Sequence, residues 1–210
     1  MKKIVLIGAG SAMFTQGLLA DMIVANEEWE VRLCDIDPEA LETAHGLARR
    51  MLAARPADIT LKASTDRREL LPGADVVVTT IAVGGRRAWE LDEQIPRKYG
   101  IHQPVGDSVM PGGISRALRH VPVMVDIARD VAELCPDALF FNYANPMSAL
   151  CLAIRQATGV PVIGLCHGVH DTLRYLARFA GVPLSTATGV AVGVNHLTWF
   201  TKFRSEGRDA

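Results

Sequence analysis

Residues 1–35 constrain the fold of this chain more than any other segment. The apolar run Ile4–Ile7 is followed directly by the Gly-Ala-Gly turn of residues 8–10, and a helical pattern begins at Ser11. A second apolar run ends at Asp35. Two parallel strands need a helical crossover between them. The order strand, glycine turn, helix and strand therefore predicts a βαβ unit.

The glycine turn has the composition of a pyrophosphate site. Gly8 permits a tight turn, Gly10 lets the backbone approach phosphates, and the helix that opens at Ser11 offers free N–H groups and a partial positive charge. The third glycine of the G-x-G-x-x-G pattern is replaced by Met13. This replacement loosens the packing of helix on strand without removing the phosphate site.

Asp35 lies about 25 residues downstream of the turn, where a carboxylate can bond a ribose hydroxyl pair. An acidic residue there repels a 2′-phosphate, which favours NAD over NADP. We therefore predict an NAD site formed by Gly8, Gly10, Ser11, Met13 and Asp35. The alternative is a glycine-rich turn in a flavodoxin-like fold that binds no dinucleotide.

Beyond Asp35, apolar runs of strand length alternate with helical patterns, as in a parallel sheet covered by helices. We predict an α/β fold with a Rossmann-type, doubly wound and mostly parallel sheet over residues 1–185. Residues 186–210 are predicted to be the first strands of a truncated second α+β domain, because the strand-like stretch 190–203 has no following helix.

The expected strands are residues 3–7, 30–34, 59–62, 75–81, 138–142 and 161–165, and the expected helices are residues 11–24, 38–54, 114–134, 147–158 and 169–180. A long connection, 82–113, interrupts the alternation and holds a short helix near 89–99. Long connections in compact domains are usually functional.

Charge and composition exclude several partners. The 210 residues include 22 basic and 23 acidic side chains, a formal net charge of −1 that does not favour nucleic acid or an acidic membrane. No stretch approaches the ~18 apolar residues of a membrane-spanning helix. The four cysteines have no repeated spacing and are typical of reduced thiols in a cytoplasmic protein.

Polar clusters follow several strands, where a doubly wound sheet binds its ligands. Asp107 precedes the pair Gly112–Gly113, which lets backbone N–H groups approach a ligand or forms an ordinary loop before a helix. Asn145 precedes Pro146 and is biased towards extended backbone. Its amide can bond a sugar or nicotinamide group, or cap a helix.

Two further clusters contain sulfur and imidazole groups. Cys166 and His167 follow the sixth expected strand, and Asn195 and His196 lie thirty residues further along. No local spacing there indicates a metal site. From spacing alone, Cys166 is interpreted as a small buried hydrophobe and His196 as a hydrogen-bonded core histidine, with a shared metal ion as the alternative.

These clusters, in this order, resemble glycoside hydrolase family 4 over essentially the whole chain. Each match is weak by itself, whereas six in register are specific. The resemblance implies a glycosidase that uses NAD and Mn²⁺ or another divalent metal ion, acts on a small-molecule α-glycoside and forms dimers or tetramers. The matching segments are Ile7–Ser11, Cys34–Pro38, Pro111–Arg119, Asn142–Met147, Gly164–His167 and Val194–His196.

In this family, an exception to the two-carboxylate mechanism, NAD takes a hydride from C3 of the sugar and so acidifies the C2 proton. A base removes that proton, the glycosidic bond breaks by elimination, water adds, and the hydride returns. A metal ion on the C2 and C3 oxygens acts as a Lewis acid. The resemblance implies Cys166 and His196 as metal ligands, Asn145, Asn195 and Arg116 as substrate-binding residues, and Asp107 and His167 as catalytic residues, with Asp107 as the acid that protonates the leaving oxygen.

Because a thiolate is a soft ligand for Mn²⁺, we expect a weakly held metal ion and an oxidation-sensitive Cys166. His167 stands where members acting on 6-phosphoglycosides carry Asp or Asn, which implies unphosphorylated sugars. Segments 35–38 and 107–114 look closest to α-galactosidases, whereas Gly168 is similar to the uronidases. We therefore predict an α-galactoside substrate, with an α-glucuronide or α-galacturonide as the alternative.

Members of this family are about twice as long and take their base, typically a tyrosine, from the other half. Tyr99, Tyr143 and Tyr175 do not match that position. We therefore expect this chain to carry the cofactor site and half of the metal and sugar site, as a fragment or a short homologue.

Two other functions remain open. A lactate/malate-type dehydrogenase shares the cofactor architecture and would release net NADH from a 2-hydroxy acid. The Cys166–His167 pair and the Pro-Gly-Gly-Ile segment at 111–114 argue against it. The other alternative is a truncated NAD-binding domain without activity.

Overall fold

A six-stranded parallel sheet forms the centre of the computed structural model, which describes residues 1–103, 106–194 and 197–209. The strand order is β3-β2-β1-β4-β5-β6, so the chain reverses direction across the sheet between β3 and β4. This order confirms the predicted doubly wound, Rossmann-type fold. The strands are β1 (Lys2–Ile7), β2 (Trp29–Cys34), β3 (Ile59–Ser64), β4 (Val76–Thr79), β5 (Leu139–Asn142) and β6 (Val162–Gly164).

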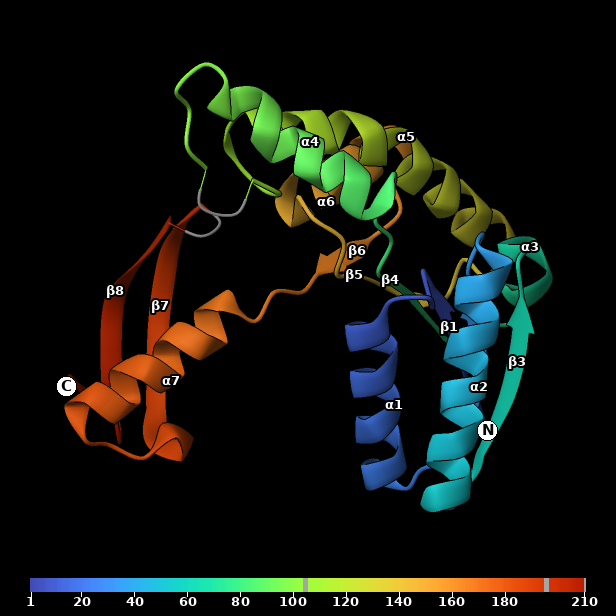
Figure 1. Ribbon diagram of the computed structural model, residues 1–210. Coiled ribbons are helices and arrows are strands. Elements are labelled where there is room, and N and C mark those ends of the chain that lie inside the picture. Colours follow the sequence, from blue (N-terminus) through green and yellow to red (C-terminus); the bar gives the residue numbers. More distant parts are fainter. Residues whose placement is uncertain (104–105, 195–196, 210) are drawn as a thin grey trace.

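Helices cover both faces of the sheet. Helices α1 and α2 pack together on one face, and α5 packs with α6 and with α4 on the other (Figure 1). Right-handed crossovers that move in opposite directions from the centre of the sheet require this division. The helices are α1 (Ala12–Ala25), α2 (Pro38–Ala54), α3 (Arg67–Leu70), α4 (Gly85–Arg97), α5 (Met110–Leu134), α6 (Met147–Thr158) and α7 (Gly168–Ala180), followed by the 3-10 turn η1 (Leu184–Thr186).

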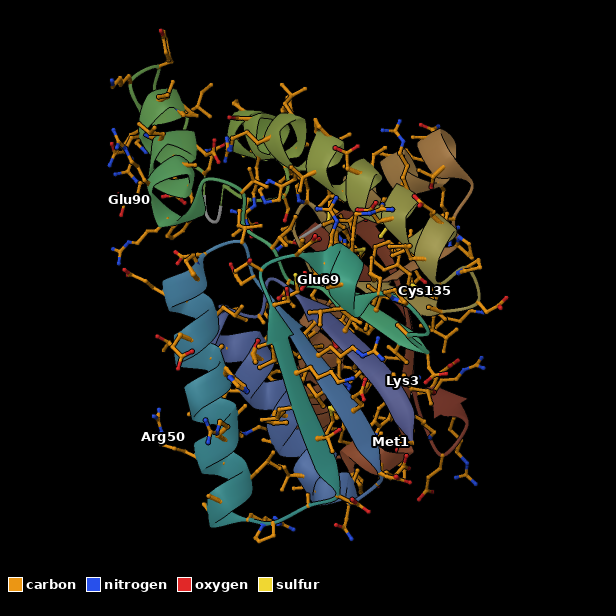
Figure 2. The ribbon with its side chains drawn as sticks, turned by 90° about the vertical axis from the view of Figure 1, so that its right-hand side faces the viewer. Met1, Lys3, Arg50, Glu69, Glu90 and Cys135 are labelled. Atoms are coloured by element: carbon orange, nitrogen blue, oxygen red, sulfur yellow. The ribbon has the colours of Figure 1, made fainter. Side chains whose placement is uncertain are left out.

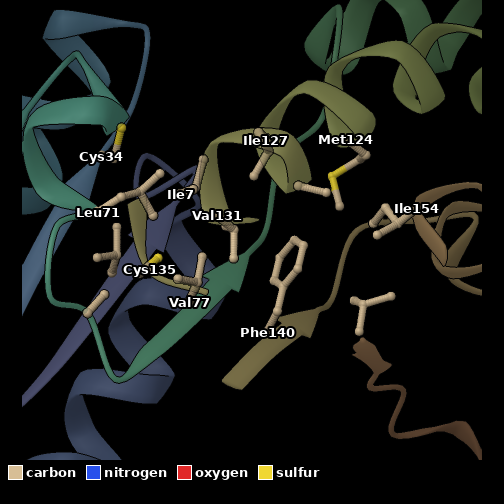
Figure 3. Packing of buried hydrophobic residues seen from close by; sticks show 14 of the residues in the cluster. Ile7, Cys34, Leu71, Val77, Met124, Ile127, Val131, Cys135, Phe140 and Ile154 are labelled. Carbon is tan, nitrogen blue, oxygen red and sulfur yellow. The ribbon is translucent and has the colours of Figure 1, made fainter. Parts of the chain in front are cut away.

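Each central strand divides its side chains between two buried clusters. In β1, Ile4 and Leu6 belong to the cluster under α1 and α2, whereas Val5 and Ile7 belong to the cluster under α5 and α6. Phe140 of β5 points towards α5 in the second cluster (Figure 3). Burial on both faces is the reason that these strands are apolar throughout.

The two ends of the sheet have different roles. Met1 and Lys3 mark the amino end of β1, while Glu69 and Glu90 lie beyond the carboxyl ends of the strands (Figure 2). Ligands of open α/β sheets bind outside the carboxyl ends. The site residues were predicted at this edge.

The C-terminal segment contains more elements than the sequence indicated. The strand-like stretch 190–203 is divided between two antiparallel strands, β7 (Ala187–Val194) and β8 (Leu197–Ser205), which are followed by the short β9 (Arg208–Asp209). The apolar pattern of a stretch does not indicate where one strand ends and its antiparallel partner begins. Helix α7 packs against β7 and η1, and together they stand apart from the six-stranded sheet (Figure 1).

No helix in the described part of the chain combines the length and apolar character needed to cross a membrane.

Candidate active site

The glycine turn is packed between the ends of two strands. The N–H groups of Gly8 and Ala9 both donate to the carbonyl oxygen of Cys34, at 2.8 and 2.9 Å. The hydroxyl of Thr80, after β4, donates to the carbonyl of Gly8 at 2.8 Å. Gly8 has a φ of 93°, and a Cβ atom there would lie 2.8 Å from the nitrogen of Ile81. Only glycine fits this position.

Asp35 is bound to the turn itself. Its Oδ2 accepts a hydrogen bond from the N–H of Gly10 at 2.7 Å, and its Oδ1 accepts one from the N–H of Asp37 at 3.0 Å. A Cβ atom on Gly10 would lie 2.8 Å from Oδ2 of Asp35. Gly10 therefore makes room for this carboxylate, a close approach that the sequence analysis assigned to phosphates alone.

The residues of the turn fit a dinucleotide. Ser11 is the N-cap of α1 and makes no side-chain capping hydrogen bond, so the N–H groups of the first turn, which have no partner within the helix, are left for an anion. A cavity of about 310 Å³ borders Gly10 and Ser11 between α1 and α2. Met13 is 85% exposed and does not lie between helix and sheet.

A second cluster joins three segments that are distant in sequence. The amide Nδ2 of Asn145 donates to Oδ2 of Asp107 at 2.9 Å, and Nε of Arg116 donates to the backbone carbonyl of Asn145 at 3.0 Å. The hydroxyl of Ser108 donates to the other oxygen of Asp107 at 2.8 Å. Burial lowers the pKa of Arg116, whereas the charge of Asp107 opposes that shift. Three of the predicted site residues, Asp107, Arg116 and Asn145, therefore meet.

The glycine pair lies at the start of a helix, which agrees with the second of the two alternatives left open by the sequence. Gly112 and Gly113 lie inside the first turn of α5, which begins at Met110 rather than Ile114. A Cβ on Gly112 would lie 2.5 Å from the carbonyl oxygen of Gly106, and one on Gly113 would lie 2.5 Å from the carbonyl carbon of Ser108. The other alternative, an approach of these glycines to a ligand, is replaced by contact with the loop that carries Asp107.

The alternative role for Asn145, capping of a helix, is not found in the structure. The N-cap of α6 is Pro146, which has no side chain able to cap the helix. The preceding bend is held by Asn142, fully buried at the end of β5, whose Oδ1 accepts from Thr79 Oγ1 at 3.0 Å and from the N–H of Ala144 at 2.9 Å. Asn142 was not predicted as a functional residue, although a polar residue at the end of an apolar strand is a usable signal.

Helices α4 and α5 are joined by an ion pair that the sequence analysis also missed. The guanidinium of Arg119 donates to both oxygens of Asp92, at 2.8 and 2.5 Å, and Asp92 is 4% exposed. Burial by itself would raise the pKa of Asp92, but hydrogen bonds from Arg119 and Ser115 hold it below its ordinary value. Two residues 27 positions apart carry no local signal of this contact.

Of the two predicted metal ligands, the structure describes Cys166. This residue is exposed, which overturns its interpretation as a buried hydrophobe, and its sulfur accepts the N–H of Gly168 at 3.4 Å. His167 is exposed and pairs through Nδ1 with Asp171 Oδ2 at 2.7 Å. Asn195 and His196 lie outside the described residues. Among the described residues, no group of three or more His, Cys, Asp and Glu side chains could hold a metal ion.

The fold and the glycine turn define a dinucleotide-binding domain of the Rossmann type. Residues 3–182 match the family described as Family 4 glycosyl hydrolase. The chain belongs to this family, which confirms the resemblance drawn from its motifs.

Known relatives agree with this membership. The chain is 40% identical to an alpha-glucosidase of Erwinia rhapontici, with 99% of this chain and 47% of that protein covered. It is 36% identical to an alpha-galactosidase of Bacillus subtilis, with 100% of this chain and 49% of that protein covered. Other relatives are named alpha-galacturonidase. The chain thus spans about half the length of the curated relatives it matches.

A solved structure gives the same fold. The 6-phospho-beta glucosidase of Thermotoga maritima, crystallised with manganese, NAD⁺ and glucose-6-phosphate, matches with a TM-score of 0.86 at 27% identity. The match covers 100% of this chain and 50% of that one.

Proposed function

We propose that this chain carries the cofactor site and part of the sugar site of an NAD- and divalent-metal-dependent glycosidase that acts on unphosphorylated α-glycosides. The observation that carries the proposal is the cluster of Asp107, Asn145 and Arg116 at the same sheet edge as the glycine turn. Membership of the family, and the NAD and manganese in a relative's structure, support it.

The chain's own residues divide the work. When bound, NAD supplies a hydride acceptor for the sugar. The N–H groups at the start of α1, which the turn at Gly8–Ser11 positions, would hold the pyrophosphate, and Asp35 would hold the ribose hydroxyls. Asn145 donates to Asp107 through Nδ2, so its Oδ1 is the atom that accepts a sugar hydroxyl. Arg116 holds the backbone of Asn145 in place.

Asp107 is proposed as the acid that protonates the leaving oxygen, and His167 as the second catalytic residue. Cys166 and His196 are proposed as the metal ligands. Of these two residues, the structure describes Cys166.

The substrate is proposed to be an α-galactoside. His167 after the metal cysteine supports an unphosphorylated sugar, and the alpha-galactosidase and alpha-glucosidase relatives support an α-linked hexose. Alpha-galacturonidase relatives and Gly168 support a uronide as the second candidate.

The test is release of nitrophenol by the full-length protein from nitrophenyl α-galactoside, α-glucoside and α-galacturonide, with NAD, Mn²⁺ and a thiol reductant. We expect turnover that requires both NAD and Mn²⁺ and leaves no net NADH. Cleavage that persists without NAD would refute the mechanism, and net NADH production from a 2-hydroxy acid would indicate a dehydrogenase instead.

Variants test the roles within that assay. Asp107→Asn should lower kcat about hundredfold, and more for an alkyl galactoside than for the nitrophenyl one, since a poor leaving group depends more on an acid. The matched control is Asp137→Asn, at an exposed position away from the site. Equal loss with both leaving groups would contradict the acid role. Cys166→Ala should abolish stimulation by Mn²⁺, with Cys135→Ala, at the amino end of β5, as its control.

A further inference from the structure

A buried histidine links the cofactor side of the site to its sugar side. His120 on α5 is 0% exposed. Its Nε2 lies 3.0 Å from the backbone nitrogen of Val83, and its Nδ1 lies 2.9 Å from the carbonyl oxygen of Arg116. Val83 belongs to the segment Thr80–Gly84, called here the β4 loop.

The two contacts fix the state of the imidazole. A backbone N–H can only donate, so Nε2 must accept from Val83 and carries no proton. A carbonyl oxygen can only accept, so the single proton of a neutral ring lies on Nδ1 and is donated to Arg116. A second proton, on Nε2, would place two donors face to face.

The β4 loop is held at both of its ends. At the first end, Thr80 donates to the carbonyl of Gly8 in the glycine turn, and the backbone nitrogen of Ile81 lies 2.8 Å from where a Cβ atom of residue 8 would be. At the other end, His120 accepts from Val83. The loop therefore connects the glycine turn to α5, whose Arg116 holds the backbone of Asn145.

We propose that His120 is a positioning residue of the active site, whose neutral imidazole holds the β4 loop against α5 and so sets the distance between the cofactor turn and the Asn145–Asp107 pair. It touches neither cofactor nor substrate and acts through Val83 and Arg116. The effect of His120 on cofactor binding rests on the proposed NAD site. The contact between His120 and the β4 loop does not depend on that site.

The surroundings of His120 favour the neutral ring. Burial lowers the pKa of its imidazole, and the charges of Arg116 and Arg119 on α5 lower it further. The hydrogen bond to the carbonyl of Arg116 and the charge of Asp92 on α4 act in the opposite direction. Since the net shift of the His120 pKa is downward, acid breaks the hydrogen bond from Val83 only at a pH below the ordinary range of histidine pKa values.

The test compares the whole chain with His120→Gln, His120→Leu and, as a matched control, His45→Gln on α2. Gln places an amide oxygen where Nε2 lies and does not titrate, whereas Leu removes the acceptor. The first readout is amide hydrogen exchange of Val83 without NAD. We expect about tenfold faster exchange in His120→Leu, near-native exchange in His120→Gln and no change in the control.

The second readout is the pH profile. Corrected for the intrinsic rate, exchange of Val83 should rise in the native chain once the pH falls below the ordinary histidine range, and it should stay flat in His120→Gln. The proposal would be overturned if the Val83 amide were equally protected in the native chain and in His120→Leu. It would also be overturned if exchange responded to acid in the same way in the native chain and in His120→Gln. If His120→Leu does not fold, the pH profiles of the native chain and of His120→Gln still test the role of His120.

The third readout is the Kd for NAD, which should rise about tenfold in His120→Leu and return in His120→Gln. A native chain that fails to bind NAD would refute the proposed cofactor site and leave the exchange result to decide the role of His120. NAD binding that is unchanged in a folded His120→Leu chain would overturn the positioning role alone.

Discussion

The six-stranded sheet has helices on both of its faces. Among the described residues, the β7–β8–β9 sheet is contacted by a single α-helix, α7. Within the small sheet, Val192 pairs with Trp199, and these residues are 50% and 59% exposed. Both large buried clusters lie in the first region. This difference teaches that the cofactor half builds its own core, whereas the described residues of the C-terminal sheet add little to that core.

The largest contrast is expected in core truncation. Phe140→Ala removes a ring that is 1% exposed and should lower the free energy of unfolding by about 3–5 kcal/mol. Trp199→Ala removes a larger ring and should cost less than about 0.5 kcal/mol. Urea unfolding measures both, and equal costs would show that the C-terminal sheet is as firmly packed as the central one.

Binding of NAD should sharpen the comparison next. At a concentration of about 100 times its Kd, a ligand stabilises the folded state by about 2.7 kcal/mol. We expect hydrogen-exchange protection to increase around the glycine turn and β4 and to stay unchanged in β7 and β8. Uniform protection of both sheets would indicate that they unfold as one unit.

Ion pairs give the third contrast. Asp92→Asn breaks the pair with Arg119 and should cost about 2 kcal/mol, less than a fully buried pair because the Arg119 side chain is 28% exposed. Asp209→Asn breaks an exposed pair with Arg204 and should cost less than about 0.5 kcal/mol. Chemical denaturation at neutral pH measures both.

The pH dependence of the Asp92 effect follows from the lowered pKa of its carboxyl group. A group with a lower pKa in the folded state stabilises it above the ordinary value of 3.8, and loses that contribution as the pH falls through the folded value. The native chain and Asp92→Asn should therefore converge in stability in acid. A difference that persists there would contradict this ionic account.

Glycines give the smallest contrast. Gly17 lies in the interior of α1, where an added Cβ atom would meet no other atom within 4 Å, so Gly17→Ala should stabilise the fold by about 0.5–1 kcal/mol. Gly207, between β8 and β9, has a φ of 78°, so Gly207→Ala should destabilise by about 1 kcal/mol. Thermal unfolding of the pair checks the signs, and two shifts of the same sign would refute the conformational argument.

Local patterns made the central fold predictable. The helix expected at residues 38–54 has the same bounds in the structure, because Asp37 caps it, Pro38 opens it and apolar residues recur on one face. The start of α5 was placed too late because a glycine pair usually disfavours helix. There, contact with residues 106–108 overrides the intrinsic preference.

Three residues of the candidate site were named from the sequence, but the contacts between them were not predicted. Asp107, Arg116 and Asn145 were named from motifs, whereas the hydrogen bonds that join them link positions 29 and 38 residues apart. His120 lies in the same helix as Arg116 and has no motif of its own, since its role depends on a backbone N–H 37 residues away. The periodicity of a sequence indicates local structure, but it does not indicate which residues distant in the sequence form hydrogen bonds with each other.

The hydrogen bonds of Asp35 have a kinetic consequence. Its carboxylate is oriented by the N–H groups of Gly10 and Asp37, which belong to the fold itself, so its side-chain entropy is lost during folding rather than on binding. A nucleotide arriving at the turn meets a preorganised acceptor and need not wait for a rearrangement. We therefore expect association to be fast, and the lifetime of the complex, rather than the rate of encounter, to distinguish good nucleotides from poor ones.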